Sequence, residues 1–212
     1  FLRDQNPGAF INLFNQREYV FAQVPYKIKP YSEILKNPKD TIVFDKDLDS
    51  LVRERRSEKG SDGALFQNGD ENIQYATFEE KILITLLAKL GNYIPETGIW
   101  LNTQRPEWND ANNALVGNGV SMVTLYYIRR FLKFFEIQNY NGITDLDLSE
   151  EVYSHFSKVV SVFNSYQIVP SRSFDDTSRK TMMDQLGNAA GEYRNTIYNR
   201  GFSGKREKLE IS

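Results

Sequence analysis

The feature that constrains the fold most is the recurrence of apolar residues every three or four positions along the second half of the chain. This spacing places apolar side chains on one face of an α-helix. It recurs in four segments, at about 78–90, 120–137, 150–163 and 177–199. Only the short run Thr41–Phe44 is typical of a strand. The pattern therefore predicts an all-α fold built of helical hairpins.

The two ends of the chain predict less regular structure. Residues 1–70 are interrupted by prolines and by a polar, glycine-bearing stretch, so we expect an irregular N-terminal part with a helix at about 48–58. Residues 201–212 begin with a glycine and are strongly charged, which favours a flexible tail. The range 1–212 would thus be a single all-α domain or a fragment of a larger one.

Three helical features carry specific expectations. Apolar residues cover most of the circumference of 120–137, which is typical of a helix buried on several sides. Thr77 and Glu80 form a capping box, in which the glutamate side chain would reach back to the start of helix 78–90. His155, the sole histidine, lies among apolar residues and is expected to be buried with its hydrogen bonds satisfied.

Residues 91–119 connect helices 78–90 and 120–137 without a helical period. Connections longer than about 12–15 residues in a compact domain are usually either functional or disordered. This one contains both tryptophans of the chain, Trp100 and Trp108, whose apolar surface favours burial. We therefore predict that 91–119 is an ordered, functional loop.

The side chains of this loop suit a carbohydrate ligand. Indole rings can pack on the apolar face of a sugar, and asparagine amides can pair with its hydroxyls. Cleavage of a glycosidic bond also needs a carboxylic acid that protonates the leaving oxygen. Glu107 or Asp110, desolvated by an indole, would have the raised pKa that this role requires. The predicted sugar-binding residues are Trp100, Asn102, Arg105, Trp108, Asn109, Asn112 and Asn113.

Trp108-Asn109-Asp110 resembles the Trp-Asn-Asp catalytic motif of the cellobiose-phosphorylase-like enzymes, which are carbohydrate-active proteins built on a six-fold α/α barrel. In that family the motif lies on a long loop between barrel helices, and its Asp is the general acid. The resemblance implies that Asp110 is the acid and that the chain is part of an α/α barrel. The family has Gly-Asp before the motif and Gly after it, whereas this chain has Pro106-Glu107 and Ala111.

The same resemblance implies an inverting mechanism without a cofactor. A phosphorylase needs one enzymic acid, because inorganic phosphate, the co-substrate, is the nucleophile. A hydrolase needs a second carboxylate as base, roughly 6.5–9.5 Å from the acid. Glu107 is close to Asp110 in sequence, so Glu96 or a group elsewhere is the better candidate for that base. The implied partners are an oligosaccharide or glycan and the rest of a larger parent chain.

Three interpretations stay open on the sequence alone. The chain could be a phosphorylase-like or glycosidase-like enzyme domain, or a non-catalytic helical module that binds a glycan or a partner protein. It could also be a purely structural lobe with Trp100 and Trp108 in its core. In that last case Asp110 would be a helix N-cap, and Arg105 would pair with Glu107 instead of clamping an anionic group.

Composition argues against several other classes. The net charge of −2 disfavours a broad nucleic-acid surface. With no cysteine and one histidine, a transition-metal site is not expected. No apolar run reaches the roughly 18–20 residues that span a membrane, so we expect a soluble chain, cytoplasmic or periplasmic. Because it begins with Phe1, we expect an excised or processed piece.

Overall fold

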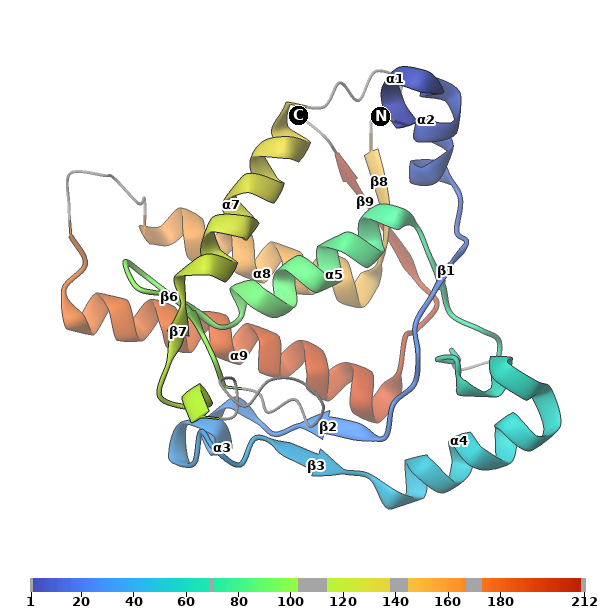
Figure 1. Ribbon diagram of the computed structural model, residues 1–212, viewed down its shortest axis with the longest axis horizontal. Helices are drawn as coiled ribbons and strands as arrows, with labels where there is room; N and C mark the ends of the chain where they lie inside the picture. The colour runs from blue at the N-terminus through green and yellow to red at the C-terminus, as the bar shows by residue number, and fades with distance from the viewer. Residues whose placement is uncertain (1, 69–70, 103–113, 138–144, 167–172, 211–212) are drawn as a thin grey trace.

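The structure, a computed structural model, describes residues 2–68, 71–102, 114–137, 145–166 and 173–210 (Figure 1). The helices are α1 Leu2–Gln5, α2 Pro7–Asn15, α3 Tyr31–Lys36, α4 Lys46–Lys59, the 3₁₀ helix η1 Gly60–Ala64, α5 Phe78–Leu90, α7 Met122–Glu136, α8 Glu150–Tyr166 and α9 Asp176–Arg200. The strands are β1 Tyr19–Val20, β2 Tyr26–Ile28, β3 Ile42–Phe44, β4 Tyr75–Ala76, β5 Tyr93–Ile94, β6 Gly98–Trp100, β7 Val120–Ser121, β8 Asp145–Ser149 and β9 Arg206–Glu210.

The prediction of an all-α fold is wrong. The strands form four small antiparallel sheets, β1–β4, β2–β3, β5–β6–β7 and β8–β9, so the fold is mixed α and β. The described residues give no evidence of an α/α barrel. Each strand is two to five residues long, and several pair with segments distant in the chain. Such short runs contain too few positions for the period-two pattern of a strand to be recognised.

The helical core agrees with the apolar periodicity. Leu87 of α5, Val159 of α8, and Met182 and Leu186 of α9 form one buried cluster. Figure 1 shows α8 and α9 running side by side in opposite directions, as a helical hairpin, with α5 across them. These three helices lie within a few residues of the predicted ranges. In these three helices, the apolar periodicity of the sequence therefore correctly predicted the face that is buried.

The exposure of helix α7 shows that the prediction of burial on several sides is wrong. The side chains of Val123, Tyr126, Tyr127 and Ile137 are 64–65% exposed. The element that α7 contacts most closely is β6, and in Figure 1 its C-terminal half stands clear of α9. Apolar residues around a helix show which side chains would be stabilised by burial. They do not determine how many other helices or strands pack against that helix.

The C-terminal segment, expected to be a flexible tail, contributes a strand. β9 pairs with β8 over five residues, from Arg206 opposite Ser149 to Glu210 opposite Asp145. Arg206 of this strand forms an ion pair with a buried carboxylate. Arg206 Nη1 lies 2.8 Å from Oε2 of Glu80, a side chain with no exposed surface.

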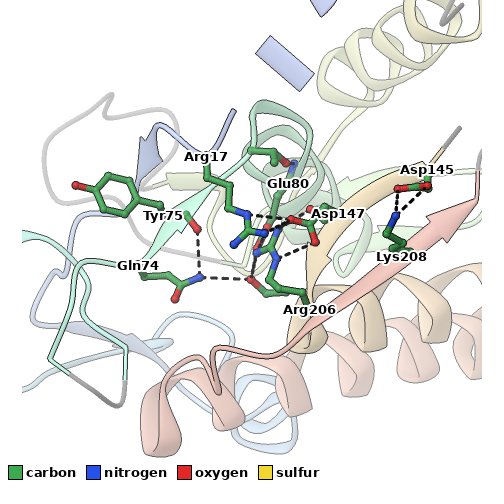
Figure 2. Close-up of polar contacts among 10 residues, drawn as sticks. Arg17, Gln74, Tyr75, Glu80, Asp145, Asp147, Arg206 and Lys208 are labelled. Atoms are coloured by element: carbon green, nitrogen blue, oxygen red, sulfur yellow. Dashed lines mark hydrogen bonds and ion pairs between the residues drawn. The ribbon is translucent and has the colours of Figure 1, made fainter. Parts of the chain in front are cut away.

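Glu80 and Arg206 belong to a polar cluster between α5 and the β8–β9 sheet (Figure 2). Ser149 Oγ donates to Glu80 Oε1, while Arg206 Nε and Nη2 donate to the carboxylate of Asp147 at 3.1 and 3.0 Å. Arg17 Nε donates to the same carboxylate at 2.9 Å. The capping box is therefore half confirmed: Thr77 accepts from the Glu80 amide, but the Glu80 side chain turns inward to Arg206. Two carboxylates and two guanidinium groups compensate one another, so we interpret this cluster as structural.

The N-terminal part is built from small elements packed on this core. The predicted helix at about 48–58 is α4, and Asp45 is its N-cap, accepting from the Leu48 amide at 2.9 Å. Tyr31 of α3 is buried against α9, where its hydroxyl donates to Asp184 at 2.7 Å. None of the helices among the described residues is long and apolar enough to cross a membrane.

The packing of α3 on α9 leads to a first prediction. A Cβ added at Gly187 would lie 2.3 Å from a ring carbon of Tyr31, so Gly187→Ala should lower the free energy of unfolding by about 1–3 kcal/mol. Gly191→Ala, one turn further along α9, is the control, because its Cβ would meet nothing closer than 3.7 Å. That variant should be neutral or slightly stabilising. Urea unfolding curves of both variants test this; equal midpoints would contradict the packing of α3 on α9.

Candidate functional site

The long connection predicted to carry function begins and ends on a small sheet. β6 pairs with β5 on one side and with β7 on the other, so that Trp100 lies opposite Val120. Beyond the strands, the Leu101 amide donates to the carbonyl of Gly119 at 2.9 Å, and the Gly117 amide donates to the carbonyl of Leu101. The two ends of the connection, residues 98–102 and 117–121, are thus paired with each other, and we call this paired region the stem.

Most of the predicted site lies outside the described residues. The two candidate acids and five of the predicted sugar-binding residues belong to this group: Arg105, Glu107, Trp108, Asn109, Asp110, Asn112 and Asn113. Trp100 and Asn102 are described, and both lie at the stem. The assignments of the other seven therefore stay predictions.

Next to the stem lies a cavity of about 670 Å³. Pockets that bind small ligands usually measure about 300–1,000 Å³. Its walls come from α5, from the β5–β6–β7 sheet, from the first turn of α7, and from α8 and α9. Both described members of the predicted site, Trp100 and Asn102, line it. Trp100 and Asn102 thus line the same cavity.

Hydrogen bonds hold both stem side chains in place. Trp100 Nε1 donates to the carbonyl of Gly117 at 3.2 Å across the stem, which orients the half-buried indole ring. Asn102 is 4% exposed, and its Nδ2 donates to Oδ1 of Asn92 at 2.8 Å. Asn92, which follows α5, lines the same cavity. One flat ring and two amides therefore lie together in the lining, a combination that suits a sugar.

Another part of the lining comes from α8 and α9. His155 is 4% exposed, and its ring stacks on Tyr193 with centroids 4.9 Å apart and an angle of 11° between the planes. Burial, together with the positive charges of Arg194 and Lys158, lowers the pKa of His155 to about 4. Burial is also the main cause that raises the pKa of Tyr193. Arg194 follows Tyr193 on α9 and also lines the cavity, and burial lowers its pKa.

The described lining of this cavity has a positive formal charge. Lys89 and Arg194 are among its lining residues, and no aspartate or glutamate is, within the part of the chain that the structure describes. An apolar floor with few, convergent polar groups is the usual composition of a ligand site. Here those groups are amides and cations.

Glu96, the candidate second carboxylate, does not line the cavity. Its carboxylate is bound to α9, where Arg179 Nη2 donates to Oε2 at 2.9 Å, and it accepts from the Phe174 amide at 3.1 Å. The hydrogen bond from Arg179 is the main cause that lowers the pKa of Glu96. A role as the base of this cavity is therefore not supported by its position.

Sequence reasoning missed Asn92, His155 and Arg194 as site residues. Asn92 lies within the predicted loop 91–119, so its amide could have been included with the other asparagines. His155 was expected to be buried, which is confirmed, but its Nδ1 has no hydrogen-bond partner in the structure. Nothing local marks Arg194, because only the packing of α9 brings it to the cavity.

No metal site is evident in the described ranges, since no group of three or more His, Asp or Glu side chains gathers there. No protein-family model matches this sequence, and no curated protein is significantly similar to it. The resemblance of Trp108-Asn109-Asp110 to the cellobiose-phosphorylase-like motif therefore stays a prediction, as does a larger parent chain as partner.

Proposed function

We propose that the chain is a carbohydrate-active domain that cleaves or transfers a glycosidic bond, with the cavity beside Trp100 as its sugar-binding site. The observation that carries this proposal is the position of Trp100, Asn92 and Asn102 on one wall of a hollow of ligand size. The ends of the connection that contains Asp110 meet at the same wall. A sugar ring stacked on Trp100 would thus lie near the stem of that connection.

In the proposed reaction, Asp110 is the general acid. Its carboxyl group donates a proton to the glycosidic oxygen as the bond from that oxygen to the anomeric carbon breaks. A nucleophile attacks the anomeric carbon from the opposite face, which inverts its configuration. Inorganic phosphate in that role gives a sugar phosphate, and water gives the free sugar; in the first case no second enzymic carboxylate is required.

The sugar-binding part of the proposal predicts a loss of affinity on removal of the stem indole. Trp100→Ala should weaken the binding of neutral disaccharides by about tenfold, which corresponds to about 1.4 kcal/mol, because the stacking face is lost. Isothermal titration calorimetry with cellobiose and maltose measures the change. Trp100→Phe keeps an aromatic face and should retain part of the affinity.

Tyr126→Ala is the matched control for this measurement. Tyr126 is an aromatic residue that is 64% exposed on α7 and does not line the cavity. Its removal should leave disaccharide binding unchanged. Wild-type binding that survives Trp100→Ala without loss would place the sugar elsewhere, and no binding of any sugar by the wild-type chain would contradict the proposal.

A further inference from the structure

Two side chains that line the cavity each contain a buried nitrogen atom for which the described residues supply no hydrogen-bond partner. These atoms are Nδ1 of His155 on α8 and Nε of Arg194 on α9. A buried polar group without a partner costs free energy, and over 90% of such groups in proteins are paired. Two of them in the wall of one cavity call for an explanation, and a ligand that pairs with both is the direct one.

The guanidinium of Arg194 is the stronger of the two indications. Arg194 is half-buried, and an arginine removed from water to this degree is ordinarily paired with a carboxylate or hydrogen-bonded, because an unpaired charge away from water is costly. Across the described residues, no ion pair or side-chain hydrogen bond involves Arg194. By contrast, Arg179, on the same helix, is paired with both Glu96 and Asp176. Arg194 therefore has its donors available for a group that the described part of the chain does not supply.

Charges on the two sides of His155 show where such a group would bind. His155 also lines a second cavity, of about 350 Å³, whose charged residues are Lys158, Arg200 and three glutamates, Glu150, Glu151 and Glu192. Its carboxylates outnumber its cations, and Lys158 is paired with Glu192, so this cavity is the less favourable one for an anion. On the side that Arg194 lines, the described wall holds cations and amides and no carboxylate. The main cavity is thus the electrostatically favourable one for an anion.

We propose that Arg194 and His155 form an oxyanion-binding subsite in the cavity beside Trp100. The oxyanion would come from either a free phosphate ion or the acidic group of a charged sugar. The inference rests on the proposed function, because it names the chemical class of one ligand of the same cavity.

The chemistry of the two side chains fits this ligand. A guanidinium presents N–H donors in a planar fork that matches phosphate and carboxylate oxygens. The imidazole can donate from Nδ1, and Tyr193 holds its ring parallel to its own. Burial is the main cause that lowers the pKa of His155, and the charges of Arg194 from α9 and Lys158 from α8 lower it further. Glu150 and Glu151 lie about one turn before it on α8. A bound anion would oppose the two cations and raise that pKa.

Because the chain contains a single histidine, nuclear magnetic resonance reports this site without assignment of other residues. We would follow the ring carbon and proton signals of His155 in the whole 212-residue chain between pH 4 and 8. The probes are inorganic phosphate, glucuronate and, as the neutral counterpart, glucose. Phosphate or glucuronate should shift the titration midpoint of His155 upward from about 4, and glucose should leave it unchanged.

Arg194→Gln should weaken binding of the effective anion by about tenfold or more, since a hydrogen bond to a charged group is lost. Arg194→Lys keeps the charge but loses the planar fork, and should be intermediate. Arg53→Gln is the control, because Arg53 is 76% exposed on α4 and pairs with Asp49 one turn before it. That variant should bind the anion like the wild type.

The outcomes separate the two ligand sources and the two proposals. A response to phosphate alone assigns free phosphate, and a response to glucuronate alone assigns an acidic sugar. No response of His155 to either anion, or an equal response in Arg194→Gln, overturns the oxyanion subsite even if neutral disaccharides bind as proposed. Anion binding without binding of any neutral sugar would instead keep the subsite and contradict the carbohydrate function.

Discussion

Asp110→Asn is expected to reduce turnover by about 100-fold to 10,000-fold while leaving the fold intact. The loss follows from the proposed role, because an amide cannot donate the proton that a general acid transfers to the leaving oxygen. The change is nearly isosteric, so binding of the sugar should persist. The measurement is the rate of release of free sugar or sugar phosphate from a panel of oligosaccharides, with and without inorganic phosphate.

Two further variants separate catalysis from helix capping at this position. Asparagine caps a helix about as well as aspartate, whereas alanine at an N-cap costs about 1 kcal/mol. If Asp110 is only a cap, Asp110→Ala should lower the unfolding midpoint while Asp110→Asn changes neither stability nor turnover. Glu107→Gln tests the other candidate acid of the connection. A full loss of turnover in Glu107→Gln, with activity retained in Asp110→Asn, would exchange the two roles.

Arg206→Met is expected to lower the free energy of unfolding by about 3–5 kcal/mol. The variant removes the charge that lies 2.8 Å from the fully buried carboxylate of Glu80, and a buried charge left without its partner is strongly destabilising. It also removes the hydrogen bonds that join β9 to Asp147 and Ser149 (Figure 2). Denaturant unfolding followed by circular dichroism gives the value.

Lys208→Met is the matched control on the same strand. Lys208 is 73% exposed and pairs with Asp145 at the surface, so its loss should cost less than 1 kcal/mol. The double variant Glu80→Leu with Arg206→Met should recover much of the stability, because no uncompensated charge remains in the interior. A cost of less than 1 kcal/mol for Arg206→Met would show that β9 is not docked as described.

The sequence predicted the elements whose signal is local and long. α5, α8 and α9 each extend over at least three turns, so the recurrence of apolar side chains on one face is counted several times within each helix. The cap of α5 followed from Thr77 and the Glu80 amide three residues later. The same local signal marked the connection at 91–119, where that periodicity stops.

The sequence did not predict the small sheets or the inner wall of the cavity. β8 and β9 pair across more than 50 residues, and the charged residues of β9 suggested a tail because their partners Asp147 and Glu80 are distant in the chain. His155 and Arg194 likewise belong to different helices, and their lack of partners is a property of packing.

The amino-acid sequence by itself determined where the long helices form and which connection carries the chemically distinctive side chains, because helix periodicity and residue type are encoded locally. Only the tertiary structure decided that the fold is mixed α and β, that α7 is exposed, and that Trp100 shares a cavity with Arg194. The reason is that strand pairing, burial of a helix face and the absence of a charge partner all depend on contacts between residues distant in the chain.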